Sequence, residues 1–264
     1  MKQLYGTYCL KDHMKKIILL SYLLVIPIMT FAQKNVVNDS IQKKEKALKF
    51  NVKQLIIPAV LCTYGALAIE SDYLKLINVE LRNELRESID EKITIDDFSQ
   101  YAPLAAVYVL NNVGKKGKHN LKDRSIIYAS SYIMMSGCVI GLKSLTKVER
   151  PDGSSNNSFP SGHTATAFSG AEFLWQEYKD VNIWYGIAGY TVATGTGFFR
   201  IYNGRHWLSD VAMGAGIGIL STKIAYWMFP YQKRIFKSER NIGSAIMPFY
   251  DGKKYGIGMV LKFK

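Results

Sequence analysis

Apolar residues gather in blocks along the chain, and polar or charged segments separate one block from the next. Blocks with the length of helices occupy 55–69, 101–113, 126–145, 163–178, 183–199 and 207–229. Short connections such as 179–182 favour helices that run up and down beside one another. Because 48% of the 264 residues are hydrophobic, the pattern predicts an all-α, membrane-embedded helical bundle.

Block length separates the segments that can cross a membrane from those that cannot. Sixteen helical residues rise by roughly 24 Å, so blocks of that size are expected to pack inside the bundle. Residues 101–113 rise by only roughly 20 Å and are expected to lie in the membrane interface or to re-enter. Residues 75–99 predict an amphipathic helix on a membrane or a partner. Its apolar side consists of Leu76, Val79, Leu81, Leu85 and Ile89.

The N-terminal segment has the pattern of an export signal. Lys15 and Lys16 form a basic start, residues 17–31 form an apolar core, and Ala32 ends a plausible cleavage site. An uncleaved first membrane helix is the alternative interpretation. Either form would send the chain into the export pathway of a bacterial envelope.

The C-terminal segment follows a different pattern. Residues 244–250 and 255–263 flank a turn-rich tetrapeptide at 251–254, which predicts a short β-hairpin. The blocks and their flanks divide the chain into four regions. These are 1–32, a signal peptide or N-terminal anchor with an upstream extension; 33–124, N-terminal helices and a linker; 125–230, the core of the bundle; and 231–264, a basic tail with the hairpin.

The chain carries a formal charge of +13, and its basic residues cluster between apolar blocks. Two clusters, at 114–124 and 231–240, are typical of membrane-proximal loops. No zinc-finger spacing or RNA-binding aromatic motif occurs, so no nucleic-acid partner is expected. Glu149 and Asp152 show no ligand spacing with a histidine, so neither a metal nor another cofactor is expected. The sequence does not indicate an oligomeric state.

Several single residues have simple structural interpretations. Glu172 lies inside an apolar block and is expected to be a bundle-facing polar partner rather than a catalyst. The three glycines within 214–218 predict close helix packing, because no strand precedes them as a nucleotide loop would require. Arg205 is expected at the surface, and assistance to a bound anion is the alternative interpretation. No role is expected for His119 in the basic loop or for His13.

Three short stretches hold residues with chemical potential at fixed spacing. They are Lys143 with Arg150-Pro151, then Pro160-Ser161-Gly162-His163, then Arg200 with His206 and Asp210. The first and third stretches follow the ends of two helical blocks, and the second opens the block between them. An up-and-down bundle therefore brings all three stretches to the same end.

The first group of these residues suits a bound phosphate. Lys143, Arg150 and Arg200 can neutralise phosphate oxygens, and arginine can bind them in a bidentate manner. Ser161 can cap the following helix and donate its hydroxyl. Gly162 allows the backbone at the positive end of that helix to approach an anion closely.

The second group suits attack on phosphorus. His206 and Asp210 are four residues apart and share one helix face. Asp210 can accept a proton from one imidazole nitrogen, which leaves the other nitrogen free to attack. His163 can protonate the departing oxygen, a contribution of typically ~10²–10⁴-fold.

The order and spacing of the three stretches resemble the tripartite motif of the type-2 phosphatidic acid phosphatase and vanadium haloperoxidase superfamily. The resemblance covers roughly residues 125–230, and Phe199 stands where the family usually has serine. It implies a metal-independent phosphatase that acts on a lipid phosphate or diphosphate. It also implies a phosphohistidine at His206, hydrolysed by water that His163 activates. Lipid A and undecaprenyl diphosphate are the leading substrates among those of the envelope lipid phosphatases.

Two other functions remain open at this stage. Soluble periplasmic acid phosphatases carry a similar motif, and a non-catalytic protein could bind or transport lipid phosphates in a membrane. The expected partners are a lipid phosphate substrate and membrane lipids. Because the basic segments 114–124 and 231–240 lie opposite the motifs, the site is expected on the periplasmic face of a multi-pass inner-membrane protein.

Overall fold

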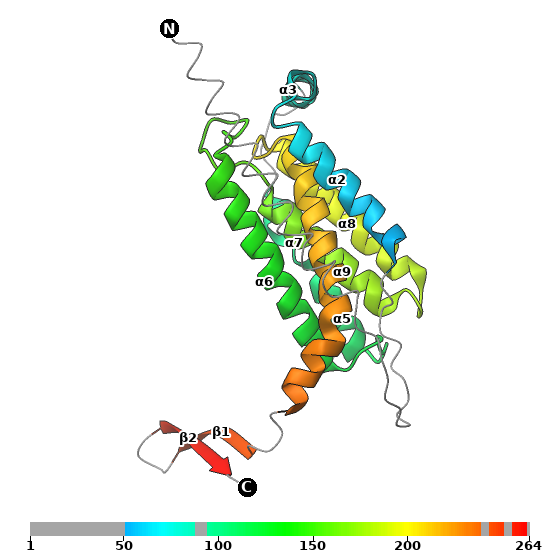
Figure 1. Cartoon of the computed structure of the whole chain (residues 1–264), viewed down its shortest axis with the longest axis vertical. Helices are drawn as coiled ribbons and strands as arrows, with labels where there is room; N and C mark the ends of the chain where they lie inside the picture. The colour runs from blue at the N-terminus through cyan, green and yellow to red at the C-terminus, as the bar shows by residue number, and fades with distance from the viewer. Residues whose placement is uncertain (1–50, 88–93, 239–242, 251–254, 263–264) are drawn as a thin grey trace.

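The computed structural model describes residues 51–87, 94–238, 243–250 and 255–262, and these form a helical bundle followed by a hairpin (Figure 1). The predicted signal, Ile89 and the turn at 251–254 lie outside the described residues. The elements are η2 Val52–Leu55, α2 Ile56–Leu67, α3 Asp72–Glu87, α4 Ile95–Ser99, α5 Ala102–Asn112, α6 Leu121–Thr146, α7 Gly162–Tyr178, α8 Ile183–Tyr202, α9 Leu208–Ser238, β1 Gly243–Tyr250 and β2 Tyr255–Lys262.

The prediction of an all-α bundle with a C-terminal hairpin is confirmed. Each apolar block coincides with a helix, and β1 pairs with β2 in an antiparallel register that sets Ser244 opposite Leu261. Asn120, Ser161 and Asn182 cap α6, α7 and α8 with their side-chain oxygens. These caps fix where each helix begins, because they satisfy backbone N–H groups that have no partner within the helix.

Helix α7 is the centre of the bundle, where it packs against α9, α8, α5 and α6. Its small residues allow this close approach, and Ala165 has no exposed surface. A Cβ atom at Gly218 would overlap the carbonyl oxygen of Ala165, and one at Gly214 would overlap that of Ser161. The predicted role of these glycines in helix packing is therefore confirmed.

Helix α2 runs antiparallel to α9. Gly65 lies against Ser209 near the start of α9, whereas Pro58 lies against Gly216 further along it. Helix α2 therefore ends at the end of the bundle where α9 begins. Helix α3 then turns by 96° from the axis of α2 and lies across that end (Figure 1).

The expectation that residues 101–113 lie in the interface or re-enter stays a prediction, and the structure adds the contacts of this segment. Helix α5 packs beside α7, with Leu104 against Gly170 and the hydroxyl of Tyr178 donating to the carbonyl of Val107 across 3.0 Å. Val107 has no exposed surface. Helices α4 and α5 together follow α7 from its start to its end.

Helix α3 is also oriented differently from the prediction. Leu76 and Val79 are exposed, whereas Leu81 and Leu85 are partly buried, so they do not form one apolar side. The side that faces the bundle carries the buried Asn78. Its side-chain amide donates to Ser209 Oγ across 3.0 Å, and its carbonyl oxygen accepts from the Ser209 backbone N–H across 3.2 Å.

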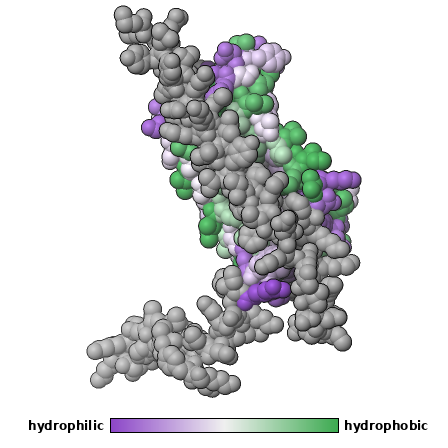
Figure 2. All heavy atoms as spheres, viewed as in Figure 1, coloured by the Kyte–Doolittle hydropathy of each residue, from purple (hydrophilic) through white to green (hydrophobic). Residues whose placement is uncertain are grey.

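The chain has the surface of a membrane protein. By length and composition, Leu121–Thr146 and Leu208–Arg234 are candidate membrane spans among the described residues. Large apolar side chains are exposed along α2, α6 and α8, and apolar patches are visible in Figure 2. They include Ile56, Ile57, Val60, Leu67, Tyr132, Ile133, Ile140, Trp184, Ile187 and Val192.

Buried ion pairs hold the helices together away from the motifs. Glu172 accepts from Lys223 Nζ across 2.7 Å and from the hydroxyl of Tyr190, as expected of a bundle-facing partner. His119 is buried, and its Nδ1 lies 2.7 Å from Glu177 Oε1. The prediction that His119 has no role is thus wrong, because this pair anchors the basic loop to the end of α7.

Candidate active site

The three predicted stretches meet at one end of the bundle, as the sequence indicates. Helix α6 ends just after Lys143, α7 begins at Gly162, and the turn between α8 and α9 joins Arg200 to Asp210. The Ser161 backbone N–H donates to the Asp210 carbonyl across 3.0 Å. The His206 backbone N–H donates to the Arg200 carbonyl across 3.2 Å.

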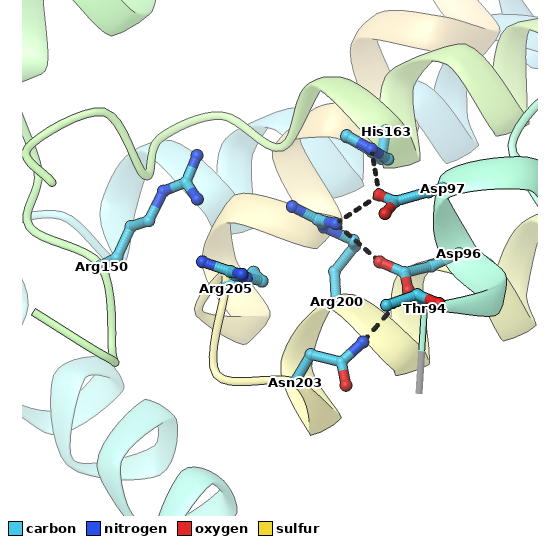
Figure 3. Close-up of a pocket in the computed structure, with 8 residues that line it drawn as sticks. All are labelled: Thr94, Asp96, Asp97, Arg150, His163, Arg200, Asn203 and Arg205. Atoms are coloured by element: carbon cyan, nitrogen blue, oxygen red, sulfur yellow. Dashed lines mark hydrogen bonds and ion pairs between the residues drawn. The ribbon is translucent and has the colours of Figure 1, made fainter. Parts of the chain in front are cut away.

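A cavity of about 330 Å³ opens at this end. Figure 3 shows Arg150 and Arg205 on one side and Arg200 with the residues of α4 on the other. The lining residues are Thr94, Asp96, Asp97, Arg150, His163, Arg200, Asn203 and Arg205. Three predicted site residues therefore line the cavity directly, and the other five lie outside its lining.

His206 is held by a network around one oxygen of Asp210. His206 Nδ1 lies 3.5 Å from Asp210 Oδ2 and 3.4 Å from Ser158 Oγ. The same Asp210 oxygen accepts from Ser158 Oγ across 2.5 Å and from the Trp207 backbone N–H across 2.8 Å. The network fixes the Nδ1 side of the ring and leaves Nε2 as the nitrogen available for chemistry.

The environment of His206 keeps its imidazole neutral. The side chain is 1% exposed, and the residue lies outside both candidate spans, in the turn before α9. Burial lowers the pKa of His206 to about 4, although Asp210 acts in the opposite direction. A neutral imidazole carries the lone pair that a nucleophile needs.

Two motif cations are held by the loop between α6 and α7. Lys143 Nζ donates to the carbonyl of Asn157 and lies 3.4 Å from that of Ser158. Arg150 Nε donates to the side-chain oxygen of Asn157 across 2.9 Å. Asn157 thus links two cations that are seven residues apart in the sequence, which orients both at the same end of the bundle.

The third cation is held by helix α4. Arg200 Nη1 donates to Asp96 Oδ2 across 2.6 Å and lies 3.4 Å from Asp97 Oδ1. Asn203 Nδ2 donates to the other oxygen of Asp96 across 3.1 Å. Arg200 Nε is buried and has no hydrogen-bond partner among the described residues. The guanidinium is therefore fixed in place with a donor still to be satisfied.

The start of α7 has the predicted cap. Ser161 Oγ accepts from the Thr164 backbone N–H at 3.4 Å and from the Thr164 hydroxyl at 2.9 Å. A Cβ atom at Gly162 would meet Val139 at 3.8 Å, which is an ordinary contact. The protein itself does not demand glycine there, so the close approach of an anion to Gly162 stays a prediction.

The sequence interpretation missed several residues of this site. Asp96 and Asp97 come from α4, which was expected to lie on a membrane or partner, and Ser158 lies in the loop before the second motif. Arg205 was expected at the surface but lines the cavity, with Nη1 3.2 Å from Asp152 Oδ2. Of these missed residues, only Ser158 could have been suspected from its position in the sequence, because it lies three residues before Ser161 of the second motif.

Comparison with known proteins agrees with the geometry. Residues 124–234 match the family model of the PAP2 superfamily. The match runs from α6 into α9 and so covers the helices that carry the three motifs. The PAP2 segment contains all eight residues that the motifs single out, whereas α4 with its two carboxylates lies outside it.

Two characterised relatives share part of the chain. A lipid A 1-phosphatase of Porphyromonas gingivalis is 44% identical over 135 residues, which are 51% of this chain and 30% of that protein. The bacitracin transport permease protein BcrC of Bacillus licheniformis is 36% identical over 75 residues, 28% of this chain and 35% of that protein. The chain therefore spans about a third of the length of each relative.

Two solved structures resemble the fold at lower similarity. Aquifex aeolicus LpxE is 24% identical and has a TM-score of 0.44, covering 56% of this chain and 94% of that one. A transmembrane PAP2-type phosphatidylglycerolphosphate phosphatase from Bacillus subtilis is 18% identical, with a TM-score of 0.41. That comparison covers 70% of this chain and 96% of the other.

Proposed function

We propose that this chain is a membrane phosphatase that hydrolyses a lipid phosphomonoester or diphosphate. The observation that carries the proposal is the meeting of three cations and two histidines, from three separate stretches, around one end of the bundle. Fixed cations neutralise the charge that phosphoryl transfer develops on the equatorial oxygens. Two histidines with different environments can divide the roles of nucleophile and acid.

In the first step of the proposed reaction, His206 Nε2 attacks phosphorus. The bond from phosphorus to the lipid oxygen breaks, and His163 gives its proton to that oxygen. Asp210 stabilises the positive charge that develops on the His206 ring. The products of this step are the free lipid alcohol, or the lipid monophosphate from a diphosphate, and a phosphohistidine.

In the second step, water attacks the phosphohistidine. His163, neutral after the first step, takes a proton from that water as the new phosphorus–oxygen bond forms. The phosphorus–nitrogen bond breaks and its electron pair returns to His206. Inorganic phosphate leaves, and both histidines regain their starting protonation states.

A lipid A phosphate is the substrate that we favour. The relative named lipid A 1-phosphatase supports it, because its similarity extends over 135 residues. Undecaprenyl diphosphate is the second candidate, since the same cations suit a diphosphate. A soluble acid phosphatase is disfavoured by the exposed aliphatic surface of α2, α6 and α8. A non-catalytic binder is disfavoured because His163 and His206 are both present.

A phosphate-release screen tests this function directly. Detergent-purified protein is incubated with lipid A, undecaprenyl diphosphate, phosphatidic acid and phosphatidylglycerol phosphate, beside a His206→Ala control. We expect release from lipid A that depends on His206. Release from undecaprenyl diphosphate alone would change the substrate. No release from any of the four lipids would remove the proposal.

We also propose that the site faces the periplasm of an inner-membrane protein. The end of the bundle opposite the motifs carries the basic loop with Lys115, Lys116 and Lys118, and it also carries Lys233 near the end of α9. Cytoplasmic loops are enriched in such residues. Since α2 runs toward the site, this orientation requires α2 to begin on the cytoplasmic side. It conflicts with an export signal at 17–31 that would leave residues 34–50 in the periplasm.

A single cysteine distinguishes the two orientations. Ser154 is exposed in the loop between α6 and α7, and Ser154→Cys is made after Cys9, Cys62 and Cys138 are replaced. A membrane-impermeant thiol reagent should label it in intact spheroplasts. Labelling only after lysis would place the site in the cytoplasm and would favour the export signal.

A further inference from the structure

Helix α4 brings two adjacent carboxylates to the cavity, and neither belongs to the three motifs. Asp96 and Asp97 lie in the first turn of α4, and both line the cavity (Figure 3). Helix α4 packs against α8 and α7, the helices that carry Arg200 and His163. The two carboxylates are therefore part of the cavity wall, beside the motif residues Arg200 and His163.

The two carboxylates have different surroundings. Asp96 is buried, and both of its oxygens are engaged, one by Arg200 and one by Asn203. The Asp97 side chain is 53% exposed, and its Oδ1 lies 3.0 Å from His163 Nε2 and 3.4 Å from Arg200 Nη1. Asp96 thus holds the cation, and Asp97 is the carboxylate that meets the histidine.

We propose that Asp97 is a positioning residue for His163, holding the ring in place and favouring the protonated form that gives its proton to the lipid oxygen. This inference rests on the phosphatase activity proposed above. Because Asp97 engages Nε2, the proton for the departing oxygen comes from Nδ1. As the phosphorus–oxygen bond breaks, the oxygen takes that proton and the ring becomes neutral. The neutral ring then takes a proton from the attacking water.

The charges around His163 make the contribution of Asp97 necessary. Within the described residues, the charged groups that face His163 are Asp97 and Asp96 on α4 and Arg200 on α8. The pKa of His163 is lowered, first by burial and then by the Arg200 guanidinium, and the hydrogen-bonded Asp97 carboxylate acts in the opposite direction. Asp96 shares its charge with Arg200, so Asp97 is the carboxylate in direct contact with the imidazole.

A pair of substrates with different leaving groups tests the role in catalysis. An alkyl phosphate needs its oxygen protonated as it leaves, whereas an aryl phosphate with an electron-withdrawing ring leaves as a stable anion. Asp97→Asn should lower kcat for the alkyl ester by about 10-fold or more, within the ~10²–10⁴-fold that general acid catalysis supplies. For the aryl ester the change should stay below about threefold, since little acid catalysis is needed.

Two further variants control for structure. Asp97→Glu keeps the carboxylate and should restore most of the lost activity toward the alkyl ester. Asp180→Asn removes an exposed carboxylate just after α7, at the opposite end of the bundle, and should change neither substrate. An equal loss on both esters in Asp97→Asn would mean a merely structural role and would overturn the proposal.

A measurement without turnover separates this inference from the proposed function. The pKa of His163 is followed by NMR of labelled histidine in detergent-solubilised protein, with the signal assigned from His163→Gln. Asp97→Asn should lower that pKa by about one unit or more, because the carboxylate at 3.0 Å is lost. This shift in a protein without phosphatase activity would refute the function and retain the pairing.

An inhibitory role for Asp97 predicts a gain of activity in Asp97→Asn instead of a loss. If its carboxylate blocked the phosphate position beside Arg200, Asp97→Asn would raise kcat/KM for both esters, and that increase would overturn the proposal. An unchanged His163 pKa in Asp97→Asn would overturn it as well, whatever the activity.

Discussion

Ser158 and Asp210 share a hydrogen bond of 2.5 Å, and the carboxylate oxygen that accepts it is the one facing His206. The two residues are 52 positions apart and lie on either side of the second motif. The serine hydroxyl and the Trp207 backbone N–H both donate to this oxygen. Asp210 is therefore held in one orientation before any substrate arrives, and it can hold the His206 ring in turn.

This network predicts a graded series of losses in turnover. His206→Ala should remove nearly all phosphate release, because no other residue in the proposed mechanism attacks phosphorus. Asp210→Asn should lose less, since the ring is misoriented but present. Ser158→Ala should lower kcat by about 10-fold, the scale of one hydrogen bond to a charged group. Phosphate release is measured for each variant, with thermal unfolding to confirm the fold.

The order of the series is the decisive result. Normal release by His206→Ala would exclude it as the nucleophile. A loss in Ser158→Ala as large as that in His206→Ala would instead assign the serine a direct chemical role.

The pH dependence of kcat/KM should reflect the buried state of His206. Burial lowers the pKa of His206 to about 4, below its ordinary value of 6.5, so the nucleophile stays neutral in mildly acidic solution. Asp210 favours the charged ring, so Asp210→Asn should move the acid limb to still lower pH. The same substrate is used for both proteins, so its own ionisation cancels in the comparison. A shift toward higher pH in the variant would contradict this arrangement.

Chelators and vanadate should act in opposite ways on turnover. Among the described residues, no group of three or more His, Cys, Asp or Glu side chains is placed to hold a metal ion, and we expect full activity in EDTA. Vanadate should inhibit, because its trigonal-bipyramidal form resembles the transition state. Arg200→Lys should weaken that inhibition by about 10-fold, since lysine lacks the planar fork of arginine. Loss of activity in EDTA with recovery on adding a divalent ion would show that an ion is required.

The glycines of α9 make a prediction for stability. Gly218→Ala should lower the free energy of unfolding by about 1–3 kcal/mol, because the new methyl group overlaps the carbonyl of Ala165 on α7. Gly137→Ala on α6 is the matched control, since nothing lies within 4 Å of its Cβ position. That change should stabilise the helix by up to about 1 kcal/mol. Thermal unfolding in detergent compares the two, and equal shifts would mean that α7 and α9 pack less closely.

Local patterns were sufficient for the part of the site that lies near helix ends. Ser161 directly precedes the helix that it caps. His206 and Asp210 are close, as their spacing predicts, but His206 lies in the turn before α9 and only Asp210 lies within that helix, so they do not share a helix face. The meeting of the three stretches at one end followed from the order and length of the blocks.

The α4 carboxylates could not be predicted in this way. Asp96 meets Arg200 across 104 positions in the sequence, and two adjacent aspartates at the end of an amphipathic segment have no distinguishing pattern. His119 was misjudged for the same reason, because its partner Glu177 lies 58 positions away. Such pairs depend on which helices become neighbours, which hydrophobic periodicity does not determine.

Segments with apolar residues on more than one side were the other source of error. In α3, Leu76 faces outward while Leu81 faces the bundle. A membrane removes the difference in cost between an apolar residue inside and one outside, so the pattern no longer identifies the buried side. The same effect left the path of α5 undecided until its contacts with α7 were known.

The pairing of Arg200 with α4 also affects the release of inorganic phosphate from the site. The three motif cations contribute three positive charges, and Asp96, Asp97 and Asp210 contribute three negative charges, so the formal sum is zero. Three uncompensated cations would retain inorganic phosphate after each cycle and slow its escape. Departure of product limits many enzymes. By balancing the cations, the α4 carboxylates favour rapid departure of phosphate, so a protein without them would be a better phosphate receptor than a catalyst.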